Sequence, residues 1–191
     1  MTAHFSAADL ICSRRTIKHF KEDPISIDVI KELLSIAVWA PNHKMREPWR
    51  FIAFLDEGKE QLINAWKQDK ESGKFPRPMK PEKFEQLKKI PAFIVVVMPV
   101  DPRPTIFEED LAAASACIQN LQLVAWERGI GMLWNTDNSI YSPVFREPLG
   151  VKPGEKIVAI LQMGYPEMTP KAQERAPIDE KLIVINKSLE S

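Results

Sequence analysis

Residues 93–98 read Phe-Ile-Val-Val-Val-Met and lie inside the longest uncharged apolar stretch of the chain, 92–100. This run is rich in β-branched residues, and it predicts a strand that is apolar on both faces. Such a strand is typical of the centre of a sheet that is covered on both sides. The expected fold therefore starts from a buried central strand.

The segments on either side of this strand alternate between helical and strand patterns. Ser6 and Ser26 are suited to cap helices, and Asp9 falls three residues after Ser6. Helices are predicted at 6–13, 26–38, 60–71, 81–90 and 108–128, a helical turn at 143–147, and strands at 50–55, 93–98, 132–136 and 157–163, with 182–185 as a further candidate. This interleaving predicts an α/β/α layered sheet in a single domain, residues 1–191.

The longest predicted helix, 108–128, begins with Glu-Glu-Asp, and negative charge suits the positive end of a helix dipole. Gly129 is well placed to end it. Small residues are dense in its first half, at 112–116, and they allow another helix to approach closely. Two interpretations of that small-residue face stay open, an interface with a second subunit and ordinary core packing.

The composition of the chain limits the classes of function that it can have. The chain has 191 residues, of which 45% are hydrophobic and 27% charged, and its 26 basic residues balance 26 acidic ones. Nucleic-acid binding would show a basic excess, and no apolar stretch approaches the length that spans a bilayer. The start of the chain lacks the pattern of a signal peptide. Two distant cysteines, Cys12 and Cys117, favour buried free thiols over a disulfide. We therefore expect a cytoplasmic protein that binds neither nucleic acid nor membranes.

Familiar cofactor and catalytic signatures are missing from the sequence. Gly129-Ile130-Gly131 follows a helix and enters a strand, the reverse of a dinucleotide-binding turn. There is no phosphate loop, no CxxC, no HExxH and no GxSxG, and the three histidines are too scattered to suggest a metal site. The sequence therefore gives no motif that would support metal-dependent hydrolysis, phosphate-loop chemistry or serine esterase chemistry.

One positive signal remains, the basic turn Ser13-Arg14-Arg15-Thr16-Ile17-Lys18. Three cations and a hydroxyl within six residues are the donors that a phosphate dianion requires. Taken alone, the segment is also compatible with an exposed basic turn.

Three segments together change this balance: SRRTIKHF (13–20), APNHKMREPWRF (40–51) and GIGMLWNT (129–136). In this order they resemble the nitroreductase family of FMN-dependent oxidoreductases, and the resemblance covers nearly the whole chain. It implies an α+β fold of three α/β/α layers. The resemblance also implies a mixed, mostly antiparallel central sheet and two chains that intertwine as a homodimer, with FMN bound at the subunit interface.

The resemblance assigns roles within the basic turn. Arg14 and Thr16, with Arg15 between them, match the family residues that hold the FMN phosphate. Lys18 matches the basic residue that reaches the pyrimidine edge of the flavin. An ammonium there would stabilise the negative charge that two-electron reduction places near N1 and O2.

Further cofactor-binding residues are implied in later segments. Asn42 and His43 match residues that approach the flavin across the dimer interface, although His43 is also compatible with a surface histidine. Pro48-Trp49 matches a packing element. The family segment matched by Trp134, Asn135 and Thr136 lies along the flavin and donates a main-chain N–H toward N5.

Arg175 matches a second phosphate-binding cation, or it is an exposed loop arginine. Departures from the commoner family pattern are Thr16 in place of Ser, Glu47 in place of Gln, and Asn135-Thr136 in place of a Gly-containing stretch. The last two concern residues that we expect to border the pocket. The proline-rich segment 72–81 is a candidate lid.

The function implied is the transfer of a hydride from NAD(P)H, via N5 of FMN, to a small oxidised acceptor such as a nitroaromatic or a quinone, by a ping-pong mechanism. No catalytic side chain is required for this, because the cofactor carries the chemistry. The alternatives are a non-catalytic FMN-binding or storage protein, a relative with other flavin chemistry such as reductive dehalogenation, and a generic α/β domain. The sequence leaves the acceptor and the choice between NADH and NADPH open.

Overall fold

Four strands form one sheet in the computed structural model, which describes residues 6–72 and 80–185. The strand order is β1 (Arg50–Leu55), β2 (Ala92–Pro99), β4 (Glu155–Gly164), β3 (Gly131–Asn135), and every ladder is antiparallel. The predicted central strand lies inside the sheet as β2 and is buried over seven of its eight positions. The prediction of a mostly antiparallel sheet is confirmed, and a parallel pairing occurs outside these strands, in an isolated bridge between Thr16 and Met132.

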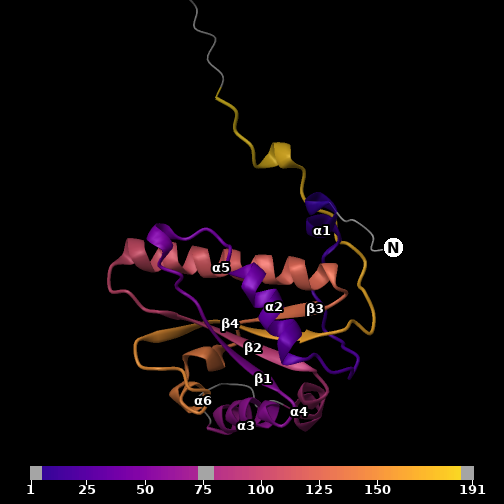
Figure 1. Ribbon diagram of the computed structural model, residues 1–191, viewed down its shortest axis with the longest axis vertical. Coiled ribbons are helices and arrows are strands. Elements are labelled where there is room, and N and C mark those ends of the chain that lie inside the picture. Colours follow the sequence, from indigo (N-terminus) through magenta and orange to yellow (C-terminus); the bar gives the residue numbers. More distant parts are fainter. Residues whose placement is uncertain (1–5, 73–79, 186–191) are drawn as a thin grey trace, which may run out of the picture.

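Helices cover both faces of this sheet (Figure 1). Alternate β2 residues enter two separate cores, Ile94 and Val96 on one side and Phe93 and Val95 on the other. The first core packs against α2 (Ile27–Ala37) and α5 (Pro104–Glu127). The second packs against α3 (Gly58–Glu71), α4 (Pro81–Lys88) and α6 (Pro143–Arg146). The three-layer α/β/α prediction is confirmed.

The remaining elements are short. Helix α1 (Ala7–Ser13) lies against α5 and begins with the predicted cap, in which Ser6 and Asp9 bond each other reciprocally. Three 3₁₀ turns complete the described chain: η1 (His43–Met45), η2 (Asn138–Tyr141) and η3 (Ile178–Glu180). No helix in the described part of the chain has the length and apolarity needed to cross a bilayer.

The predicted start of α5 at Glu108 is wrong. The helix begins at Pro104, and its first turn contains no acidic residue. Proline is favoured at the first helical position because its missing N–H would be unpaired there anyway. The acidic trio lies further along, where Asp110 is needed for an ion pair described below. Gly129 ends the helix as predicted, with a left-handed φ of +74°.

Within the small-residue stretch of α5, Ala113 and Ala114 are buried, and Ala114 belongs to the core shared with α2 and the sheet. Ala112 is exposed, and Ser115 and Ala116 are half-buried, so part of this stretch stays open to an interface with a second subunit. Of the two cysteines, both are free, but only Cys117 is buried, and burial raises its pKa to about 12. The exposed position of Cys12 contradicts the expectation that both thiols are buried.

The predicted strand at 182–185 is also wrong. The chain after β4 leaves the body of the molecule (Figure 1), and residues 182–185 pair with no strand of the described chain. Its apolar side chains are strongly exposed, with Ile183 at 86% and Ile185 at 85%. Apolar, β-branched residues provide the strand propensity, but a strand needs a neighbour. The candidate lid, 72–81, falls mostly outside the described residues.

The basic turn is held against the sheet by close backbone contacts. Ile17 is fully buried, and its N–H donates to the carbonyl of Met132 at 3.0 Å. A Cβ on Gly131 would lie 2.3 Å from Cγ1 of Ile17, so only glycine permits this approach. Further along, the N–H of Lys21 donates to the carbonyl of Tyr165 at 2.9 Å. Residues 16–21 therefore lie along the β3 edge and the exit of β4.

We predict that Gly131→Ala destabilises the protein by about 1–3 kcal/mol, because the added methyl overpacks against Ile17. The matched control is Gly58→Ala, since a Cβ at Gly58 meets nothing within 4 Å. That change should leave stability unchanged or raise it by up to about 1 kcal/mol. Urea denaturation followed by circular dichroism measures both. Equal stabilities for the two variants would contradict the close approach.

Candidate functional site

A pocket of about 870 Å³ lies between two segments that are far apart in the sequence. One wall comes from the end of α1 and the basic turn, and the other from residues 168–175, which follow β4. The lining residues are Ile11, Cys12, Arg14, Arg15, Thr16, Lys18, His19, Met168, Pro170, Lys171, Ala172, Gln173 and Arg175. No lining residue of the described chain is acidic. The pocket therefore has a positive potential that suits an anion.

Arg14 has the least satisfied polar group of this pocket. Its Nε is buried and has no hydrogen-bond partner in the described chain. Burial, and then the like charges of Arg15 and Arg175, lower the pKa of Arg14. A guanidinium with a free buried N–H, beside two other arginines, gains most from a multivalent oxyanion.

The side chain of Arg15 hydrogen-bonds to nearby backbone carbonyl groups. Its Nη1 donates to the carbonyl of Cys12 at 2.7 Å and to the carbonyl of Arg14 at 2.9 Å, at the end of α1. Cations are favoured there because the last carbonyls of a helix lack partners. Arg15 therefore shapes the turn that presents Arg14, and Ser13 is anchored beside it by a bond from Trp126 Nε1 at 3.1 Å.

The strand β3 leaves an open backbone edge next to this turn. The Met132 carbonyl accepts from Ile17, so it points away from β4. Residues two apart in a strand share an edge, and Trp134 therefore directs its N–H to the same open side, whereas Asn135 faces β4. Strand β3 ends at Asn135, and Thr136 follows directly after it. The side chain of Trp134 packs on the core, as does that of Trp49.

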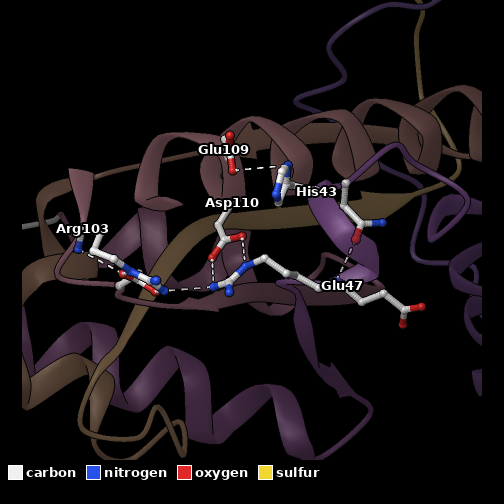
Figure 2. A network of polar contacts seen from close by, with 8 residues as sticks. His43, Glu47, Arg103, Glu109 and Asp110 are labelled. Atoms are coloured by element: carbon white, nitrogen blue, oxygen red, sulfur yellow. Dashed lines mark hydrogen bonds and ion pairs between the residues drawn. The ribbon is translucent and has the colours of Figure 1, made fainter. Parts of the chain in front are cut away.

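Asn42 and His43 do not line the pocket. They lie in the loop between α2 and β1, where Asn42 accepts from the N–H of Glu47 at 2.9 Å, and where His43 Nδ1 lies 3.8 Å from Glu109 Oε2 (Figure 2). Three non-glycine residues of this loop have left-handed backbones: Lys44, Met45 and Glu47. Such conformations are strained and persist only where neighbouring contacts enforce them.

The enforcing contact is a bidentate ion pair. Arg46 donates from Nε and Nη2 to the two carboxylate oxygens of Asp110 at 2.9 and 2.8 Å, and Asp110 is 2% exposed. Asp101 lies 3.6 Å from Arg46 and accepts two side-chain bonds from Arg103 (Figure 2). These bonds to Arg103, with one from its backbone N–H, hold the pKa of Asp101 well below its usual range. The network ties the strained loop to α5.

Comparison with known proteins assigns this chain to a family. The model of the nitroreductase family matches residues 11–165. This chain belongs to the nitroreductase family. The sequence resemblance drawn from the basic turn and the two later segments is thereby confirmed.

Proteins similar to this chain match it over almost its whole length. Bacillus subtilis YfhC, whose name assigns it provisionally to the NAD(P)H nitroreductases, is 39% identical over 93% of each chain. A nitroreductase-like protein from Bacillus cereus has a crystal structure with a TM-score of 0.88, at 37% identity, covering 98% of this chain and all of its own. NfnB of a Sphingopyxis strain, described as an FMN- and NADPH-dependent nitroreductase, has a TM-score of 0.80 at 15% identity, covering 96% of this chain and 100% of its own.

Five of the residues that the sequence assigned to the cofactor line this pocket: Arg14, Arg15, Thr16, Lys18 and Arg175. Sequence reasoning missed His19 and Lys171, which also line the pocket. His19 directly follows the basic turn, and Lys171 lies four residues before Arg175, so proximity to assigned residues was the available signal. No group of three or more potential metal ligands occurs in the described chain.

We predict that Arg46→Met lowers the stability of the protein, because it leaves the buried Asp110 carboxylate without its bidentate partner. The double variant Arg46→Met/Asp110→Leu should recover most of that loss, since no uncompensated charge remains. Thermal and urea unfolding of the wild type, the single variant and the double variant measure the effect. A single variant as stable as the wild type would show that the pair does not hold the loop.

Proposed function

We propose that this nitroreductase is an FMN-dependent oxidoreductase that passes a hydride from NADH or NADPH to a small oxidised acceptor, such as a quinone or a nitroaromatic, in a ping-pong cycle. The observation that carries the proposal is the acid-free pocket in which Arg14 has a buried, unpartnered Nε beside Arg175. A phosphate ester is the ligand that this donor set favours. The family and the description of NfnB support FMN as the molecule that bears it.

The pocket residues fit the phosphate end of FMN. Arg14 and Arg175 approach from opposite walls, and the exposed hydroxyl of Thr16 lies between the two basic positions of the turn. A monoester dianion would satisfy Arg14 Nε and relieve the repulsion between the arginines. The fit supports the assignment of Arg14, Thr16 and Arg175 to the phosphate, with Arg15 in a supporting position.

Two further features suit the ring of the cofactor, which supplies the hydride-accepting atom N5 when bound. Lys18 is exposed in the same pocket, where its ammonium would stabilise negative charge on the reduced ring. The open edge of β3 presents a main-chain N–H at Trp134, whereas Asn135 faces β4. We therefore assign the N5 donor to Trp134 or Thr136 in preference to Asn135.

We further propose that the enzyme is a cytoplasmic homodimer with the cofactor at the subunit interface. Exposed apolar side chains gather on the extended segment 178–185 and on the body at Trp39, which is 86% exposed, and Met45, at 74%. Surfaces of this kind mark protein interfaces. Met45 belongs to the loop of Asn42 and His43, so a second chain seated there would bring that loop toward the partner's pocket.

The direct test is the visible spectrum of the purified protein and its bleaching by NADPH or NADH without oxygen. We predict a yellow protein in the wild type. Arg14→Ala should weaken FMN binding by about 10–150-fold, since a lost charge-assisted contact is worth about 1.5–3 kcal/mol. Fluorescence titration of apoprotein with FMN measures this. The control is Arg128→Ala, which removes an arginine paired with Glu32 away from the pocket.

The assays also separate the alternatives. Oxidation of NADPH or NADH with a quinone or nitroaromatic should give parallel double-reciprocal lines, the pattern of a ping-pong cycle. A yellow protein without turnover would favour an FMN-storage role, and turnover restricted to halogenated substrates would favour reductive dehalogenation. A colourless protein that FMN cannot reconstitute, or unchanged FMN affinity in Arg14→Ala, would remove the proposed site.

A further inference from the structure

The pocket contains more positive charge than an FMN phosphate requires. Five lysine or arginine side chains line it, Arg14, Arg15, Lys18, Lys171 and Arg175, together with His19 and no carboxylate of the described chain. Under the function proposed above, Arg14, Arg175 and Thr16 serve the phosphate, Lys18 serves the ring, and Arg15 bonds the backbone. Lys171 and His19 are left without a role.

Lys171 and His19 line the same pocket as the arginines. The side chain of Lys171 makes no hydrogen bond or ion pair with any residue of the described chain, and the same holds for the ring of His19. An unpaired ammonium on the wall of a cavity is available to a second anion.

The size of the pocket allows for a second ligand group. Its volume of about 870 Å³ is near the upper end of the range of roughly 300–1,000 Å³ for small-molecule sites. The electron donor brings the second anion with it. NADPH differs from NADH only by a phosphate monoester on the adenosine ribose, which carries about −1.5 to −2 charge near neutral pH.

We propose that Lys171, assisted by His19, binds the 2′-phosphate of NADPH and makes NADPH the preferred electron donor of this enzyme. The two residues lie on opposite walls, His19 after the basic turn and Lys171 in the segment after β4. The backbone connects these walls, since the N–H of Glu167 donates to the carbonyl of His19 at 3.1 Å. The inference rests on the proposed function and adds the identity of the donor.

The first experiment compares kcat/KM for NADPH and NADH, at one acceptor concentration, in the wild type and in Lys171→Gln. The wild type should prefer NADPH. In Lys171→Gln, kcat/KM for NADPH should fall about tenfold, while the value for NADH stays within twofold, because only NADPH loses a charge-assisted contact. Lys83→Gln is the matched control. Lys83 is exposed on α4, in the helical layer on the other face of the sheet, and its loss should leave both values unchanged.

The second experiment measures binding without turnover. Adenosine 2′,5′-bisphosphate and adenosine 5′-monophosphate are titrated calorimetrically into the FMN-loaded protein. Lys171→Gln should raise the Kd of the bisphosphate about tenfold and leave that of the monophosphate within twofold. The difference between the two ligands should shrink as salt is raised, since the contact is an exposed ion pair.

The outcomes separate the two proposals. A protein that holds no FMN defeats the proposed function itself. With FMN bound, equal loss of NADPH and NADH activity in Lys171→Gln, or a parallel loss of FMN affinity, would assign Lys171 to the flavin site and overturn the inference. An unchanged preference for NADPH, an unchanged Kd of the bisphosphate, or a wild type that prefers NADH would overturn it as well.

Discussion

The docking of residues 16–21 against the sheet is the constraint on which the pocket depends. Ile17 enters the core over Gly131, and its N–H bonds Met132 at the edge of β3. Through this contact, Arg14 is placed at a fixed position opposite a segment that follows β4 and contains Arg175. Arginines about 160 positions apart in the chain thus face one cavity, and neither segment forms a pocket alone.

Holding the positive charges of these arginines close together costs free energy, and an anionic ligand would offset that cost. The lowered pKa of Arg14 reports the burial and the repulsion, and no described carboxylate in the pocket lining compensates them. An anion that binds the folded chain and not the unfolded one stabilises it by mass action. Cofactor binding and fold stability are therefore expected to be linked here, in contrast to the Arg46–Asp110 pair, which is complete within the chain.

Local signals in the sequence predicted the local structure well. The strand 50–55 was placed with its observed ends, and Ser6 and Ser26 cap the helices expected of them. The incorrect predictions fall where the structure depends on contacts between residues that are far apart in the sequence. The acidic residues suggested a helix start at Glu108, but Asp110 is used by Arg46, which is 64 positions away. Residues 182–185 have strand propensity without a partner strand. Lys171 lies four residues before Arg175, but only the folded chain shows that both line the wall opposite the basic turn.

The loop of Asn42 and His43 is held in a strained conformation by contacts within the chain. Its three left-handed residues cost about 1–3 kcal/mol each, and a buried ion pair is not in itself an efficient source of stability. The network nevertheless fixes the loop in a single shape, with Met45 exposed and His43 beside Glu109, away from the pocket lining. Backbone strain that surrounding contacts enforce in this way is typical of functional segments. In the homodimer proposed above, this loop would meet the cofactor of the neighbouring subunit, and its rigid form would then serve the partner's site.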